Sequence, residues 1–341
     1  MNHFFKLLTL VITMSASAVY AQHENDIVYF LAAGPQDASK LTQAYLNPAI
    51  EGLSYGFNGG WYNSAKTHKT FGFDLGIAVH GVGIPSSYNY FDPRKLNLQT
   101  ITGFTSTATN GLAPAISGPE VTTTYTVDNG TTFNGPKGVD FKKSIGINGV
   151  LAPTAQLSLG IYKNTDLKIR WLPEISSNST TIKAFGVGVM HDIKQHIRGI
   201  SILPFDLSLL VAYTHIEGTT SLENTFDKPT TDQRKQEMTY GMDGWLYQAL
   251  ISKKIAIVTF FGGVGVTTAR TNANTRGSYV IPEVGTLKDP ISLDFKNNSM
   301  RVAAGMRFNF GPVYLSGEYS LQEYSMVSVG LGVSFRESKI Y

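Results

Sequence analysis

Charged side chains on segments of alternating hydrophobicity are the groups in this sequence with the clearest potential for chemistry. They fall on the face opposite the apolar residues, and a closed β-barrel would enclose them: Asp74, Lys168, Arg170, Asp206, Arg301, Arg307 and Glu318. Charges in a confined lumen either select solutes, hold a plug, or pair with one another as structural ion pairs. Arg307 and Glu318 lie near one predicted turn on neighbouring strands, so we expect a cross-strand ion pair between them.

Signals for catalysis and for metal binding are weak. The histidines show no His-Glu-x-x-His spacing, and residues 262–265 lack the lysine and the helix that follow a phosphate-binding loop. His191 and His196 lie close together beside a predicted turn, where a role in the turn is favoured over a metal site. We therefore expect no enzyme, no metal and no cofactor, with a barrel protease or lipase as the less favoured alternative.

The composition limits the class of protein. Charged residues make up 16% of the chain and the formal net charge is +3, while hydrophobic residues make up 42%. That balance excludes a disordered chain, and the weak basic excess argues against a nucleic-acid partner. The absence of cysteine excludes disulfide scaffolds, thiol catalysis and Cys-ligated metal sites.

The N-terminus predicts export. Lys6, a short apolar run and small residues before Ala21 are typical of a secretory signal peptide over residues 1–21, with a buried helix as the alternative. The rest of the sequence has no apolar run of the length that a membrane helix needs. An exported chain of this kind is either a soluble protein or a transmembrane barrel.

One helix is expected after the signal peptide. Residues 35–46 are good helix formers with an apolar face, and Asn47-Pro48 predicts its end. We assign residues 22–52 to a helical N-terminal segment that could plug a barrel, with Asn47, Pro48 and Ala49 as the plug candidates.

Segments of about ten residues alternate in hydrophobicity through the remainder of the chain. In residues 300–310, for example, the even positions are apolar and the odd ones small or charged. Similar segments occur at residues 54–63, 71–80, 153–162, 167–171, 182–191, 205–214, 245–251, 255–266, 313–321 and 327–335. With up to three more in the polar region 94–147, they predict an all-β fold, a transmembrane antiparallel β-barrel of about 12 to 14 strands over residues 53–341.

The connections support a barrel over a soluble β-sandwich. Short turns at residues 163–165, 252–254 and 311–312 alternate with longer polar stretches at 176–180, 217–239 and 268–298, as in outer-membrane barrels. The last strand resembles the signal that the barrel-assembly machinery recognises, with Gly330, Val333 and Phe335 as its key positions. Here six residues follow the Phe, whereas the usual signal ends the chain.

Longer motifs resemble an uncharacterised family of exported proteins from Bacteroidota-type bacteria. They are LTQAYLNPA at 41–49, GGWYNSAK at 59–66, GVMHDIKQ at 188–195 and LPFDLS at 203–208. More distantly, the helix ending in Asn47-Pro48-Ala49 resembles the start of the outer-membrane long-chain fatty acid transporters, which implies an N-terminal hatch inside a barrel.

The sequence thus predicts an outer-membrane channel or transporter for a small solute, hydrophobic solutes included. Its expected partners are outer-membrane lipid, the barrel-assembly machinery, the solute and other envelope proteins. The alternative is a structural or assembly component of an envelope or secretion complex.

Overall fold

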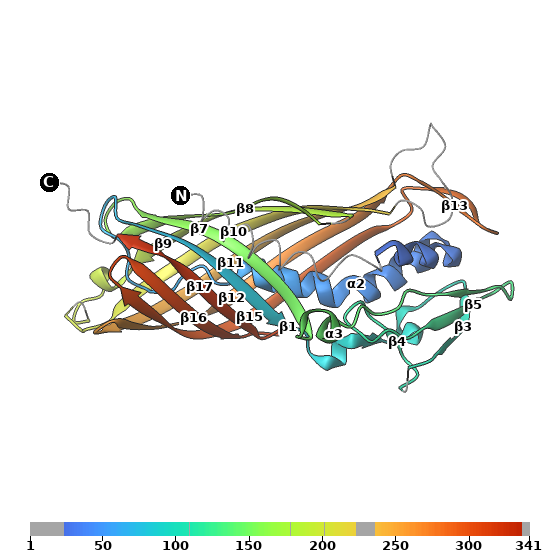
Figure 1. The fold of residues 1–341 in the computed structure, drawn as a ribbon, viewed down its shortest axis with the longest axis horizontal. Coiled ribbons are helices and arrows are strands. Elements are labelled where there is room, and N and C mark those ends of the chain that lie inside the picture. The colour runs from blue at the N-terminus through green and yellow to red at the C-terminus, as the bar shows by residue number, and fades with distance from the viewer. Residues whose placement is uncertain (1–23, 109, 178, 201, 223–235, 336–341) are drawn as a thin grey trace.

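The computed structural model describes residues 24–108, 110–177, 179–200, 202–222 and 236–335. Their main feature is a closed antiparallel barrel with the strand order β1-β17-β16-β15-β12-β11-β10-β9-β8-β7 (Figure 1). The ten strands are β1 (Phe73–Gly83), β7 (Gly149–Gly160), β8 (Thr165–Ser177), β9 (Thr180–Asp192), β10 (Asp206–Ser221), β11 (Glu237–Ile255), β12 (Val258–Arg276), β15 (Ser292–Phe310), β16 (Val313–Leu321) and β17 (Met326–Phe335). The barrel fold class is confirmed.

The barrel has fewer strands than the 12 to 14 that were predicted. Residues 54–63, expected as a strand, form the end of a helix and the chain that follows it inside the barrel. The polar region 94–147 forms small sheets outside the barrel wall instead of further barrel strands. Alternating hydrophobicity shows that a segment has two different faces, but pairing with neighbours decides whether it joins the wall.

Each barrel strand turns its apolar side chains outward and its polar side chains inward, as the period of two requires. On β15, Met300 and Val302 are 78% and 49% exposed on the outer surface, whereas Arg301 and Arg307 are 1% exposed and point into the lumen. The outward positions of β15 that precede Met300 are polar, and Asp294 there pairs with Arg270 of β12. The outer surface is therefore an apolar band with a charged border at one end.

Aromatic rings lie at that border. Tyr213 of β10 and Trp245 of β11 face outward with ring centroids 5.0 Å apart, and Trp245 stacks on Tyr247. The next outward position along each strand is charged: His215 and Asp243 pair with each other. Aromatic residues followed by charges are typical of the edge of a bilayer.

The connections differ between the two rims. At the short-turn rim, brief turns join β7 to β8, β11 to β12 and β15 to β16. The same rim holds the first residue of β1 and the last residue of β17. The opposite, long-loop rim carries residues 84–148 between β1 and β7 and a hairpin of β13 (Ser278–Ile281) and β14 (Gly285–Lys288). Residues 217–221 and 237–239 of one expected loop and most of the other, 268–298, are strand, so β10, β11, β12 and β15 extend well beyond the shorter strands.

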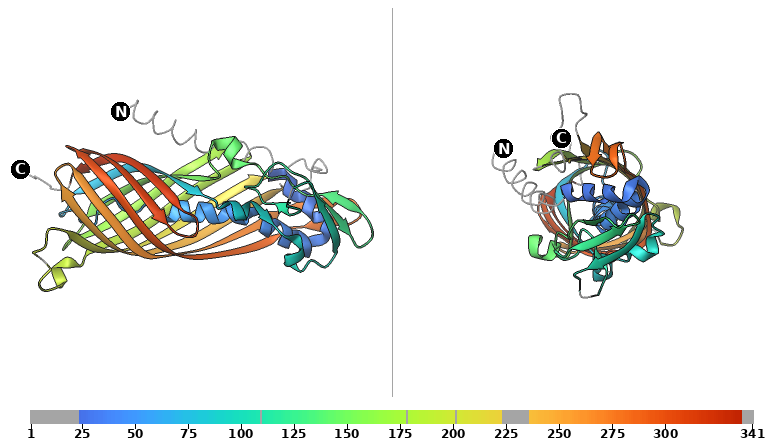
Figure 2. Two further views of the ribbon diagram at one scale, coloured as in Figure 1. Left: turned by 90° about the horizontal axis from the view of Figure 1, so that it is seen from below. Right: turned by 90° about the vertical axis from the view of Figure 1, so that its right-hand side faces the viewer.

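The N-terminal part of the chain enters the barrel from the long-loop rim. A 3₁₀ helix, η1 (Glu24–Ala33), leads into α2 (Gly34–Asn58), which contacts β1, β7, β10, β11, β12 and β15. Seen end on, α2 lies within the ring of strands (Figure 2). The predicted stop at Asn47-Pro48 is wrong: Pro48 lies inside the helix, where buried packing compensates for the hydrogen bond that proline cannot donate.

Residues 84–148, which we name the cap, fold against η1 and the first half of α2 (Figure 1). The cap contains two small sheets, β2-β4 and β3-β5-β6. Its elements are η2 (Ser86–Asn89), β2 (Tyr90–Phe91), η3 (Pro93–Leu96), β3 (Ile101–Ser106), β4 (Ala113–Pro114), β5 (Thr123–Val127), β6 (Thr132–Asn134) and α3 (Phe141–Ile145). Among the described residues, no helix has the length and apolar character to cross a membrane. The predicted signal peptide, residues 1–21, lies outside the described part of the chain.

A buried carboxylate in the first turn of α2 holds the cap. Asp37 accepts hydrogen bonds from the backbone N–H groups of Gln99 (2.9 Å) and Thr100 (2.8 Å) and from the Thr100 hydroxyl (2.8 Å). Burial raises the pKa of Asp37, but these hydrogen bonds outweigh it, so the pKa lies below its ordinary value of 3.8. The contact therefore stabilises the fold above the unfolded pKa and is lost as the pH falls through the folded value.

We expect Asp37→Asn to weaken the cap contact by about 1 to 3 kcal/mol at neutral pH, because an amide oxygen replaces a carboxylate that accepts several bonds. Hydrogen exchange at the Gln99 and Thr100 amides measures the change. The difference from wild type should shrink as the pH falls below 3.8 and through the lower folded pKa, where Asp37 itself becomes protonated. Asp128→Asn, at an exposed carboxylate of the same cap, is the control. Equal exchange in the two variants would contradict the role of Asp37.

Candidate functional site

The helix α2 ends inside the barrel, where its last carbonyl groups need donors. Arg170, which points inward from β8, provides them. Its Nη1 donates to the carbonyl oxygens of Phe57 (2.8 Å) and Gly59 (2.7 Å). Its Nη2 donates to that of Gly60 (2.9 Å). A guanidinium binds several acceptors at once, and its positive charge suits the C-terminal end of a helix. Arg170 therefore fixes the end of α2 to the wall.

The half of the barrel next to the short-turn rim is called the lower half here, and the half next to the long-loop rim the upper half. The chain from α2 to β1, residues 59–72, crosses the lower half, and we name it the lumenal segment. Trp61 is fully buried in it, with the Arg170 guanidinium 4.1 Å above its ring. The ring lies against Gly186 and Gly188 of β9, and a Cβ at Gly186 would come within 2.9 Å of the indole. At Gly60 φ is +65°, and a Cβ there would meet the ring of His80 at 2.1 Å. Glycine is required at these positions because the rings of Trp61 and His80 pack directly against the backbone.

Further wall residues bind the lumenal segment, through its backbone and through the side chain of Asn63. Ser208 of β10 donates its hydroxyl proton to the carbonyl of Ala65 (2.6 Å), and the Ala65 N–H donates to the hydroxyl of Ser252 on β11 (3.0 Å). Arg307 Nη1 donates to the side-chain oxygen of Asn63 (2.6 Å). A non-helical segment in a barrel needs such partners, because the described backbone hydrogen bonds within it are limited to the one from the Gly72 N–H to the Lys69 carbonyl (2.8 Å).

A chain of ionisable groups ties the lower part of the segment to three strands. His68 Nδ1 lies 2.8 Å from Asp166 of β8, and His68 Nε2 lies 3.0 Å from Asp74 of β1. The second oxygen of Asp74 accepts a hydrogen bond from Arg307 of β15 (2.7 Å). Asp166 also accepts the backbone N–H of His68 (2.8 Å). All four side chains are buried.

The expected ion pair between Arg307 and Glu318 does not form. Glu318 accepts from Arg301 Nη2 (2.6 Å), while Arg307 binds Asp74. The register places Arg307 opposite Ser316, whereas Asp74 comes from β1, which barrel closure places beyond β16 and β17 in the wall. The pairing thus depends on closure of the barrel, which the sequence of two neighbouring strands does not reveal.

The remaining predicted charges divide into two groups. Lys168 is buried and donates to the hydroxyl of Ser158 (3.2 Å). Asp206 is half-buried at the start of β10, where it accepts a hydrogen bond from the Ser252 hydroxyl (3.3 Å). It is the one predicted charge in this set that is not fully buried. The structure therefore brings together six of the predicted charges, each at most 6% exposed: Asp74, Lys168, Arg170, Arg301, Arg307 and Glu318.

Sequence reasoning missed His68 and Asp166. Asp166 shares the alternation of Lys168 and Arg170, so the same pattern could have identified it. His68 lies in the lumenal segment, which carries no periodic signal of its own.

The other predicted positions lie on α2 and β17. Asn47, Pro48 and Ala49 are in the part of α2 that lies in the upper half of the barrel. Gly330, Val333 and Phe335 are on β17, which closes the barrel by pairing with β1, and the Phe335 ring lies 5.2 Å from that of Phe73. Recognition of this strand by the assembly machinery stays a prediction.

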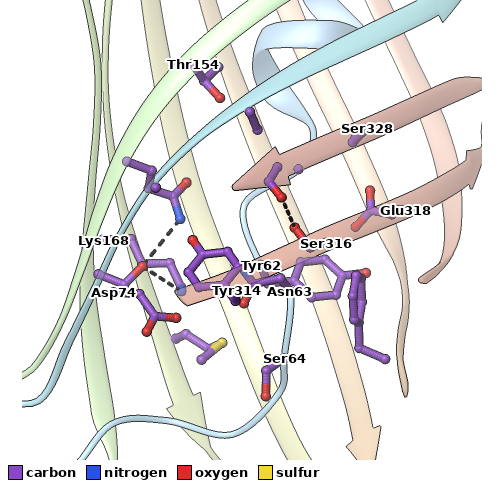
Figure 3. A pocket seen from close by; sticks show the side chains of 18 of the residues that line it. Tyr62, Asn63, Ser64, Asp74, Thr154, Lys168, Tyr314, Ser316, Glu318 and Ser328 are labelled. Atoms are coloured by element: carbon purple, nitrogen blue, oxygen red, sulfur yellow. Dashed lines mark hydrogen bonds between the residues drawn. The ribbon is translucent and has the colours of Figure 1, made fainter. Parts of the chain in front are cut away.

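A small polar cavity lies beside the lumenal segment (Figure 3). Its volume is about 50 Å³, and its walls carry the side chains of Tyr62, Asn63, Asp74, Lys168 and Glu318. A polar space of this size has room for about three or four water molecules. The lower half of the lumen is thus suited to water and to polar groups.

A larger cavity of about 150 Å³ lies in the upper half, between α2 and the wall. Apolar side chains make up most of its surface. They come from α2, the cap and strands β7 to β11: Leu46, Ala49, Ile50, Leu53, Phe57, Ile116, Leu151, Pro153, Leu172, Ile175, Ile182, Ile216, Tyr240 and Met242. Among the described residues, this is the site best suited to an apolar ligand.

The apolar cavity borders an interruption in the wall. Pairing between β7 and β8 stops at Ala155 and Trp171, although both strands continue toward the long-loop rim. Beyond that point β7 follows β1 while β8 follows β9, with a bulge after Leu172. Pro153 and Pro173 on the two edges have no N–H to donate. We name residues 149–154 and 172–177 the β7–β8 seam.

We expect Arg170→Lys to destabilise the protein by about 3 kcal/mol, because a single ammonium cannot replace the buried fork that binds three carbonyl groups. Urea unfolding of the detergent-solubilised barrel measures the loss, and hydrogen exchange of residues 57–61 shows its location. The control is Arg94→Lys, at an exposed arginine paired with Asp92 in the cap. Equal stability of the two variants would show that Arg170 does not anchor α2.

Comparisons with solved structures find outer-membrane barrels of very different sequence. The translocator domain of the autotransporter NalP from Neisseria meningitidis is 13% identical, with 86% of this chain and 93% of that chain covered and a TM-score of 0.28. A FadL homologue from Pseudomonas aeruginosa is 10% identical, with 85% and 98% covered and a TM-score of 0.26. Ail of Yersinia pestis is 8% identical, with 79% and 99% covered and a TM-score of 0.26.

No curated protein is significantly similar to this chain. A family model matches residues 1–335, and its description is a family of unknown function, DUF6588. The expected membership in a family without an assigned activity is thereby confirmed. The chain, with its filled ten-strand barrel, belongs to the DUF6588 family.

Proposed function

We propose that this protein is an outer-membrane barrel that binds a small apolar solute and passes it across or into the membrane, without transforming it chemically. The apolar cavity between α2 and the wall is the observation that carries the proposal. Its volume of about 150 Å³ matches that of engineered protein cavities that bind benzene. A solute with a single aromatic ring or a short hydrocarbon chain therefore fits the site.

The outer surface supports the membrane location. An apolar band surrounds the closed part of the barrel, with Tyr213 and Trp245 at one border and charged pairs beyond them. In outer-membrane barrels the short turns face the periplasm, so the cap and the β13–β14 hairpin would face outward. In this orientation the apolar cavity lies in the outer half of the barrel.

The lower lumen supports a plug. Arg170, Arg307 and the pair of His68 with Asp166 hold the lumenal segment across the barrel. The plug would then include α2 and residues 59–72, beyond the predicted limit at residue 52. An apolar solute gains nothing from the polar lower cavity, so the β7–β8 seam is the more favourable exit from the upper cavity.

The alternative function, a component of an envelope or secretion complex, has support from the cap. The cap has its own small sheets and lies against α2 at the long-loop rim, where it could serve as a platform for another envelope protein. Stable co-purification of an envelope protein that depends on the cap, together with no binding of apolar probes, would favour this alternative.

The binding test uses toluene with the barrel in lipid nanodiscs, followed by NMR of the methyl groups that line the cavity. We expect saturable binding, lost in Ala49→Phe because the ring fills the cavity. Ala44→Phe, on the same helix and outside the cavity lining, is the control and should bind like wild type. Binding that is absent, or that persists unchanged in Ala49→Phe, would contradict the proposed site.

The exit route through the seam is tested by the rates at which toluene binds and dissociates. We expect Pro173→Trp, at the exposed edge of the seam and outside the cavity lining, to slow toluene association and dissociation by similar factors, because a bulky ring narrows the passage without changing the bound state. The equilibrium affinity should then stay within about twofold of wild type. Rates that do not change would rule out the seam as the route while leaving the cavity itself intact.

A further inference from the structure

Two histidines at the short-turn rim face each other through their Nε2 atoms. His191 is the last residue but one of β9, and His196 lies in η4 (Lys194–His196), the short helix that follows. The two nitrogens are 3.1 Å apart, and the ring centroids are 5.3 Å apart with an angle of 27° between the ring planes. Neither histidine lines either cavity, so the proposed transport function does not involve the pair.

The orientation of the His191 ring is set by a second hydrogen bond. Its Nδ1 lies 2.8 Å from the hydroxyl oxygen of Thr165 at the start of β8. If Nδ1–H donates to this oxygen, Nε2 carries the lone pair, 3.1 Å from the Nε2 of His196 and 3.5 Å from the amide nitrogen of Gln195. A hydrogen bond on the far nitrogen that fixes ring and tautomer is the usual support of a metal-binding histidine.

Neighbouring contacts hold the turn in place around the pair. Gln195 donates from its amide to the carbonyl of Asp192 (3.0 Å) and accepts from Asn164 of the β7–β8 turn (3.1 Å). The ammonium of Lys194 is directed away, to the carbonyl of Leu203 and over the ring of Phe205. The histidines are partly exposed, so an ion can reach them from solvent.

The distance between the two nitrogens fits two ligands of one transition-metal ion. Zinc binds imidazole at about 2.0 to 2.1 Å, and two such ligands at the tetrahedral angle lie about 3.3 Å apart. Neutral imidazole favours Zn²⁺ and Cu²⁺ over Ca²⁺ and Mg²⁺. The described residues hold no group of three or more His, Asp or Glu side chains able to bind a metal, so water would complete the coordination.

We propose that His191 and His196 form a two-histidine site for a divalent transition metal, of the class of Zn²⁺ or Cu²⁺. The bound ion joins the end of β9 to the β9–β10 connection. Thr165 is a positioning residue, because it acts on the metal only through His191. The site goes beyond the proposed transport function and does not depend on it.

The test titrates tag-free, folded barrel in detergent with Zn²⁺ by calorimetry. We expect one ion per chain, with affinity reduced at least tenfold in His191→Gln and in His196→Gln. His215→Gln is the matched control, because His215 lies on the outer wall against Asp243 and should leave the affinity unchanged. Heat-modifiable migration of each variant checks that it is folded.

Two further measurements separate a built site from adventitious binding. Thr165→Val should weaken Zn²⁺ binding severalfold without removing a ligand. Electron paramagnetic resonance of the Cu²⁺-loaded protein should show coupling to two imidazole nitrogens in wild type and to one in either histidine variant. Absence of saturable binding, or binding that survives unchanged in both histidine variants, would overturn the proposal and leave a direct hydrogen bond between the rings.

Discussion

A helix that ends inside a closed barrel leaves carbonyl groups without donors, and the rest of the interior depends on how they are satisfied. Arg170 meets this need with a buried guanidinium that reaches Phe57, Gly59 and Gly60. The same side chain packs on Trp61, and Trp61 in turn needs the bare backbone of β9 at Gly186 and Gly188. The position of α2, the path of the lumenal segment and the small residues of the facing wall are therefore parts of one arrangement.

The lumen has two halves of opposite character for a simple reason. In α2 the backbone satisfies its own hydrogen bonds, so the helix can present Ala49, Ile50 and Leu53 to the wall and leave an apolar cavity. The lumenal segment is not helical, and its N–H and C=O groups require partners from the wall. Buried hydroxyls and charges collect around it for that purpose, and the cavity beside it is polar.

The seam follows from the lengths and partners of the strands. β7 pairs with β1 up to Gly149 and Gly83, where the cap begins, while β8 continues with β9 along the longer side of the barrel. Unpaired strand edges are costly in lipid. Proline at positions 153 and 173 removes one donor from each edge and so reduces that cost. Apolar side chains from both edges border the cavity, so the interruption lies directly beside it.

The sequence by itself determined the barrel class, the segments that became its ten strands, and the inward direction of charges such as Arg170 and Arg301, because alternation is a local property of a strand. It also indicated a helix before the first strand. Only the tertiary structure decided that α2 continues past Pro48, that residues 54–63 leave the wall, and that Arg307 binds Asp74 while Glu318 binds Arg301. Each of these depends on contacts between residues far apart in the chain, made when the barrel closes around the helix, and no local pattern encodes such closure.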